Sequence, residues 1–125
     1  MTLKQIEKSA PSENPGKGKT KLAPGEAVDL ASLVNYGEDS IVSRTLVNNS
    51  AGTVTLFAFD EGQGLSEHAA PFDALVHIIE GESEVIIDGK QNKVRKGQLI
   101  LMPANIPHAL NAAKRFKMML TMVRK

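Results

Sequence analysis

Two of the three histidines in this 125-residue chain, His68 and His108, are the side chains best suited to chemistry near neutral pH. Imidazole titrates close to pH 7, so it acts as a general acid or base, and it is also a common metal ligand. The chain contains no cysteine, which excludes disulfides, thiolate metal sites and a cysteine nucleophile.

The elements that must position these histidines are short strands. Runs of β-branched and large apolar residues, separated by turn signals, predict strands at 41–47, 53–59, 74–79, 84–87, 99–102 and 116–123. Residues 48–52 predict a hairpin turn, and Asp88-Gly89 predicts a two-residue turn with positive φ. Asp29 is expected to cap a short helical turn through Leu30, Leu33 and Val34. This pattern favours an all-β antiparallel sandwich or barrel.

Several of these strands carry apolar side chains on both faces. In the strand around residues 73–79, alternation divides the side chains into two sets: Ala74, Val76 and Ile78 on one face, and Leu75, His77 and Ile79 on the other. Only one face can line a barrel interior. A second sheet, the N-terminal segment or another subunit must cover the other face. We therefore predict a homodimer.

The length of the chain predicts one domain. Residues 9–21 are rich in Pro, Gly, Ser and Lys, so we predict a flexible basic arm over residues 1–25 and a barrel domain over residues 26–125. The first residues lack the apolar core of a signal peptide, and no stretch approaches the ~20 apolar residues of a membrane helix. The sequence therefore predicts a cytoplasmic protein without a membrane partner.

Charge is segregated along the chain. Residues 26–88 hold 12 of the 14 acidic residues, whereas residues 89–125 hold nine Lys or Arg and no acid. A basic segment can indicate a nucleic-acid surface, but aromatic residues do not alternate with the charges here and no groove-reading helix is visible. We predict no nucleic-acid partner and expect basic strands to lie beside acidic ones.

Residues 62–110 resemble the two motifs of the cupin superfamily, and in particular its small single-domain, conserved-barrel (type-2) members. The first motif runs from Gly62 through His68 to Gly81, and the second runs from Gly97 through Pro103 and Pro107 to His108. The resemblance implies an antiparallel double-stranded β-helix, the cupin jelly-roll barrel, with the N-terminal arm outside it. It also implies a fold that is commonly dimeric.

Cupins usually hold a metal through an HxH pair, an acid several residues later and a histidine of the second motif. His68 and His108 occupy the first and last positions, but Ala70 stands in place of the second histidine and Ala74 in place of the acid. Gln98 also replaces the usual Asp of the second motif. Two imidazoles fall short of the three or four ligands that Zn²⁺ prefers. We interpret the site as degenerate, with no cofactor or a weakly bound divalent metal on His68 and His108.

Other polar residues near the motifs are poor substitutes for the missing ligands. By strand parity, Glu67, Asp73 and His77 point to the opposite face from the predicted ligands. The first two are interpreted as rim carboxylates, and His77 as a packed residue.

Two alanines in place of an imidazole and a carboxylate leave volume and an apolar wall beside two polar nitrogens. This predicts a small-molecule pocket lined by His68, Ala70, Ala74, Val76, Met102 and His108. The sequence favours a small-molecule-binding cupin of unknown substrate. One alternative is a metal-dependent enzyme of dioxygenase or isomerase type that uses His68 and His108. Another is a metal-free acid–base isomerase or epimerase.

Overall fold

The computed structural model describes residues 22–124, so most of the arm predicted for residues 1–25 lies outside the described residues. The prediction of an all-β antiparallel fold is confirmed. Over residues 22–124, a short 3-10 helix, η1 (Leu30–Leu33), precedes nine strands. The strands are β1 (Ile41–Asn49), β2 (Gly52–Phe59), β3 (Gly64–His68), β4 (Asp73–Glu80), β5 (Glu82–Ile87), β6 (Lys90–Arg95), β7 (Leu99–Met102), β8 (His108–Asn111) and β9 (Phe116–Val123).

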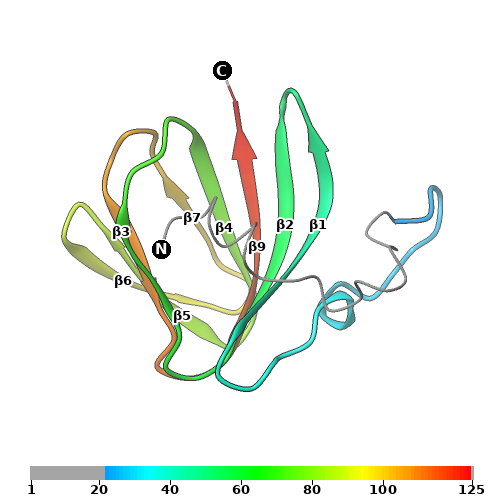
Figure 1. The fold of residues 1–125 in the computed structure, drawn as a ribbon, viewed down its shortest axis with the longest axis horizontal. Helices are drawn as coiled ribbons and strands as arrows, with labels where there is room; N and C mark the ends of the chain where they lie inside the picture. The colour runs from blue at the N-terminus through cyan, green and yellow to red at the C-terminus, as the bar shows by residue number, and fades with distance from the viewer. Residues whose placement is uncertain (1–21, 125) are drawn as a thin grey trace.

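The strands form two antiparallel sheets that face each other (Figure 1). The larger sheet has the order β1-β2-β9-β4-β7, and the smaller has the order β3-β8-β5-β6. Non-consecutive neighbours such as β2 and β9 show that the chain crosses repeatedly between the sheets, as in a jelly roll. Asp88 and Gly89 both have positive φ in the β5–β6 turn, as the sequence predicts.

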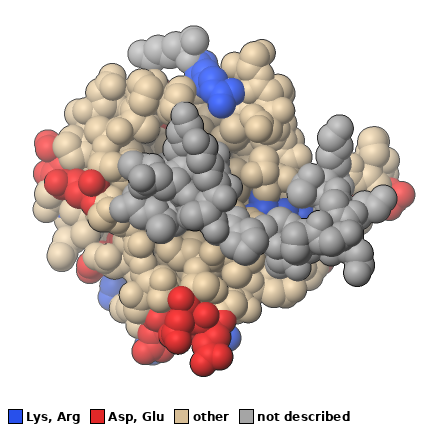
Figure 2. Space-filling model, in the orientation of Figure 1, with Lys and Arg blue, Asp and Glu red and all other residues tan. Residues whose placement is uncertain are grey.

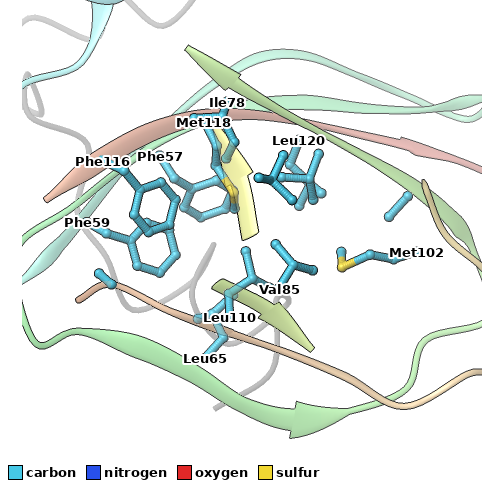
Figure 3. Packing of buried hydrophobic residues seen from close by; sticks show 14 residues of the cluster. Phe57, Phe59, Leu65, Ile78, Val85, Met102, Leu110, Phe116, Met118 and Leu120 are labelled. Carbon is cyan, nitrogen blue, oxygen red and sulfur yellow. The ribbon is translucent and has the colours of Figure 1, made fainter. Parts of the chain in front are cut away.

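The main core fills the space between the sheets. Its buried residues come mainly from the inward faces of β2 to β9, including Phe57 and Phe59 of β2, Phe116 and Met118 of β9, and Val85 of β5 (Figure 3). Phe59 and Phe116 stack with ring centroids 4.5 Å apart. Their large apolar area supplies much of the driving force that holds the two sheets together.

Residues 30–36 form a strap that covers part of the outer face of the larger sheet. Val34 of the strap is buried with Leu56 and Ala58 of β2, and Ile79 and Met119 pack against this second cluster. The segment before β1 thus covers part of the outer face of the larger sheet, which is one of the three covers expected from the sequence.

Polar groups also hold the strap in place. Lys117 is only 7% exposed, and its ammonium group donates a hydrogen bond to the Ala31 carbonyl at 2.7 Å. Arg44 donates to the Leu33 carbonyl at 3.1 Å. The Tyr36 hydroxyl donates to a Glu80 carboxylate oxygen at 2.5 Å. Burial and the Glu80 carboxylate raise the pKa of Tyr36, so the phenol stays protonated and keeps this bond.

The strap leaves the far side of the outer face uncovered. Leu99 and Leu101 of β7 are 61% and 49% exposed, and Val123 of β9 is also exposed. Leu75 of β4, opposite Leu101 in the strand register, is half-buried. We call these four residues the outer apolar face. The described part of the chain contains no helix with the length and hydropathy needed to cross a bilayer.

Candidate functional site

Two loops bring both motif histidines to one end of the barrel. His68 ends β3 and His108 begins β8, and the two residues are opposite each other in the strand register. The β3–β4 and β7–β8 loops are tied together, because Asn105 N–H donates to the Ala70 carbonyl at 2.7 Å. In addition, Ala104 N–H donates to a carboxylate oxygen of Asp73 at 2.9 Å. We call this region the histidine end.

The two imidazoles are in edge contact. Their ring centroids lie 4.5 Å apart with an interplanar angle of 69°. His68 Nδ1 is 2.9 Å from the Ser66 carbonyl, and His108 Nδ1 is 3.0 Å from the Ile106 carbonyl. A carbonyl oxygen only accepts hydrogen bonds, so Nδ1 carries the proton in both rings. A neutral His108 ring therefore offers its Nε2 lone pair to a ligand.

His108 Nε2 is a buried polar atom without a hydrogen-bond partner among residues 22–124. The side chain is 1% exposed. Burial lowers the pKa of His108 below its usual value near 6.5, and the neighbouring His68 lowers it further, although the bond to the Ile106 carbonyl opposes both effects. His108 is consequently a neutral acceptor at neutral pH. An unsatisfied buried group of this kind costs about 1–3 kcal/mol, which a bound ligand can recover.

The facing sheet contributes an inward row of residues to the same end of the barrel. Thr53 of β2 is opposite Met122 of β9, Met122 is opposite Ala74 of β4, and Ala74 is opposite Met102 of β7. Because β4 and β7 begin or end at the two tied loops, this row lies at the histidine end.

Thr53 is a site residue that sequence reasoning missed. It is 5% exposed, and its hydroxyl has no partner among residues 22–124. The available signal was its alternation with Thr55, Phe57 and Phe59, which places all four side chains on the inner face.

The structure separates the predicted pocket residues into three groups. His68 and His108 come together, as predicted. Ala74, Val76 and Met102 are buried in the main core, on the inward faces of β4 and β7. Ala70 lies in the β3–β4 loop and is half-buried. The ligand pocket itself stays a prediction.

Comparisons with known proteins agree with this architecture. The family model for the cupin domain matches residues 55–124, which is more than half of the chain. This chain belongs to the cupin family. No curated protein matches it.

Several solved structures resemble the chain over most of its length. A conserved protein of unknown function from Streptococcus pyogenes is 39% identical with a TM-score of 0.79, and the match covers 83% of this chain and 91% of that one. A cupin 2 conserved barrel domain protein from Leptotrichia buccalis is 42% identical with a TM-score of 0.75, over 78% of this chain and 47% of that one. Salicylate 1,2-dioxygenase from Pseudoaminobacter salicylatoxidans is 17% identical with a TM-score of 0.62, over 66% and 26% of the two chains, and so shares only the fold.

The residues of this cupin do not fit a complete metal centre. Within residues 22–124, no group of three or more His, Asp or Glu side chains comes close enough to hold an ion. Asp73 is occupied by the Ala104 N–H, Glu67 is exposed, and His77 lies on the outer face opposite Met119. Gln98, which replaces the second-motif Asp, accepts a hydrogen bond from Arg95 N–H at 2.8 Å and so stabilises a turn. Among residues 22–124, the close pair of His68 and His108 is therefore at least one ligand short of the three or four that a Zn²⁺ site needs.

The unpaired hydroxyl of Thr53 should lower the stability of this cupin, so removing it should stabilise the fold. We expect Thr53→Val to raise the free energy of unfolding by about 1 kcal/mol, because valine removes an unsatisfied buried hydroxyl. Urea denaturation measures the change. Thr55→Val is the matched control, since the Thr55 hydroxyl lies 3.5 Å from that of Thr45 and loses this contact. A stability loss in Thr53→Val that equals or exceeds the loss in Thr55→Val would contradict an orphaned hydroxyl.

Proposed function

We propose that this cupin binds a small organic molecule at the histidine end without a tightly held metal. The observation that carries the proposal is the buried, unpaired Nε2 of His108 beside His68. Natural proteins rarely leave such an atom unsatisfied unless a ligand or a catalytic role uses it. The apolar row that contains Met122, Ala74 and Met102 supplies the kind of wall that surrounds a few polar anchors in ligand sites.

The hydrogen-bonding pattern restricts the ligand. His108 Nε2 accepts a hydrogen bond because Nδ1 is committed to the Ile106 carbonyl as a donor. The ligand should therefore present a hydroxyl or N–H group to His108. The Thr53 hydroxyl, which both donates and accepts, is available for a second polar group of the ligand.

A metal-free isomerase or epimerase is a second candidate, and the His108 geometry favours it. A neutral imidazole with its Nδ1 proton held by a backbone carbonyl has the form of a general base. His68, which is more exposed, would have to enter the reaction as an imidazolium, so that it donates its Nε2 proton to the substrate while His108 accepts one. The metal-dependent alternative has less support, because the dioxygenase resemblance is limited to the fold and the ligand set is incomplete.

A fragment screen by NMR tests the proposed binding. The protein carries ¹³C-methyl methionine, and the probes are uncharged alcohols, phenols and amides of about 15 heavy atoms or fewer. We expect hits to shift the Met102 and Met122 methyl signals, and Met118 serves as an internal control because it lies deeper among the aromatic residues (Figure 3).

The variant His108→Phe is the matched control for the screen, since it keeps an aromatic ring but removes the acceptor nitrogen. Hits that lose at least fivefold in affinity in this variant support the proposal. Hits that bind both proteins equally, or a screen in which neither Met102 nor Met122 responds, would overturn it.

We also propose that the outer apolar face forms a homodimer interface. Leu99, Leu101 and Val123 are large apolar side chains that remain exposed on the part of the sheet that the strap does not cover. Contiguous exposed apolar residues on a sheet commonly mark an interface, and an interface between two copies should bury more than ~1,000 Å² in total.

Sedimentation velocity tests the dimer. We expect the parent protein to sediment as a dimer at micromolar concentration and Leu99→Glu/Leu101→Glu to sediment as a monomer. Val28→Glu is the control, because Val28 is exposed but lies before the strap and outside the outer apolar face. A monomeric parent, or a dimeric double variant, would show that this face is not the interface.

A further inference from the structure

A hollow lies away from the histidine end. It has a volume of about 750 Å³ and is lined by the start of β5, the end of β6 and the β8–β9 loop. His108 and Asn111 mark opposite ends of β8, and the loop that lines the hollow follows Asn111. The hollow is thus separate from the candidate site described above. Its volume lies within the range of small-molecule sites, about 300–1,000 Å³.

The hollow gathers much of the basic charge that the sequence concentrates after residue 88. Five cationic side chains line it, together with two carboxylates, Glu82 and Glu84. The cations are Lys93, Arg95, Lys96, Lys114 and Arg115. The five cations outnumber the two carboxylates in the lining, whereas acidic side chains gather at the lower edge of the face in Figure 2. The hollow therefore carries a net positive charge.

Most of these cations are already offset by acids. Glu82 lies 3.6 Å from the Lys93 ammonium and 4.0 Å from the Arg95 guanidinium. Glu84 is opposite Lys93 in the strand register, where the two charges attract. Arg115 pairs with Asp60 at 3.2 Å, and backbone N–H groups together with Arg115 lower the pKa of that carboxyl. Asp60 therefore stays ionised and holds Arg115.

Lys96 and Lys114 carry the positive charge of the hollow that these carboxylates do not offset. Neither lysine has a carboxylate within ion-pair distance in the part of the chain that the structure describes. Backbone hydrogen bonds hold the segments that carry both lysines. Lys96 N–H donates to the Gly81 carbonyl at 3.0 Å, and the loop before Lys114 is held where Gly62 N–H donates to the Ala112 carbonyl at 2.8 Å. Two lysines from different segments thus face one hollow without counter-ions.

We propose that this hollow binds a small phosphate monoester, with Lys96 and Lys114 on the phosphate. A phosphate monoester near neutral pH carries close to two negative charges, which matches the two uncompensated lysines. Lysine ammonium groups bind phosphate as point charges without a fixed geometry. The volume of 750 Å³ also accommodates an organic group on the ester. The proposal is independent of the function assigned to the histidine end.

The test is a titration of the full chain with ribose 5-phosphate, with ribose as the uncharged probe, followed by amide NMR at low salt. We expect ribose 5-phosphate to shift the Lys96 and Lys114 amides and ribose to leave them unchanged. Raising NaCl should weaken the binding, because exposed charges are screened. Lys96→Glu and Lys114→Glu should each weaken it at least fivefold.

Lys90→Glu is the matched control. It makes the same change in net charge on an exposed residue outside the hollow, and should weaken binding less than twofold. The proposal is overturned if neither lysine amide responds to 10 mM ribose 5-phosphate. It is equally overturned if Lys90→Glu weakens binding as much as Lys96→Glu, because the protein would then attract anions only through its overall charge.

Discussion

The variant Ala70→His/Ala74→Glu should bind Zn²⁺ on the order of a hundredfold more tightly than the parent protein. Backbone carbonyls hold Nδ1 of both His68 and His108 in the manner of metal-binding histidines, so Nε2 is the nitrogen of each ring that would bind a metal. The two substitutions add the imidazole and the carboxylate that a four-ligand site needs. Calorimetric titration measures the affinity of each protein.

The stability of this variant should also depend on Zn²⁺. Ala74 is buried, so a glutamate there is costly until a cation neutralises it. Zn²⁺ should therefore raise the Tm of the double variant by much more than that of the parent. Ala70→Gln/Ala74→Gln is the control of similar size. Equal Zn²⁺ affinity in the double variant and in this control would show that Ala70 and Ala74 do not stand at vacated ligand positions.

Gly81→Ala should be among the most destabilising single substitutions in the chain, at about 3–5 kcal/mol. Gly81 has a φ of +74°, and an added Cβ would lie 2.6 Å from the Arg115 carbonyl oxygen and 3.1 Å from Phe116 Cβ. The first of these is a backbone atom, so it cannot rotate away. The close packing of the β4–β5 turn against the start of β9 thus explains why the first motif ends in a glycine, Gly81.

The variant Gly89→Ala separates the two causes of this loss of stability, which are backbone strain at positive φ and the close contact of the added Cβ. Gly89 has a similar φ of +78°, but no atom lies within 4 Å of its added Cβ. It should cost about 1 kcal/mol, from backbone strain alone. Urea denaturation of the two variants provides the comparison. Equal losses would show that the β4–β5 turn is not tightly packed on Arg115.

The apolar strands were predictable because their composition reflects their burial. β2, β4, β7 and β9 are rich in β-branched and large apolar residues, and the sequence places all four within one residue of their observed ends. β3, β6 and β8 were not predicted as strands. β6 reads Lys-Gln-Asn-Lys-Val-Arg and lies at the edge of the smaller sheet, where only Val94 is buried. Long-range pairing with β5, which composition does not reveal, makes it a strand.

The candidate site was predictable to a similar degree. The motif spacing brought His68 and His108 together correctly, and strand parity correctly turned His77 away from them. The sequence could not locate Thr53 in the site, because that residue reaches the histidine end through its register with Met122 on β9, about 70 positions away in the chain. Nor could it foresee the basic hollow, which needs three separate segments to meet.

Calorimetric titration of the metal-stripped parent protein with Zn²⁺ tests the central claim most directly. With two imidazoles and no third His, Asp or Glu grouped with them among residues 22–124, we expect weak binding or none, with a Kd above about 10 μM. Metal analysis of the protein as purified should likewise give well under one ion per chain. Stoichiometric binding with a submicromolar Kd would contradict the account, because another group of this chain would then have to complete a metal centre around His68 and His108.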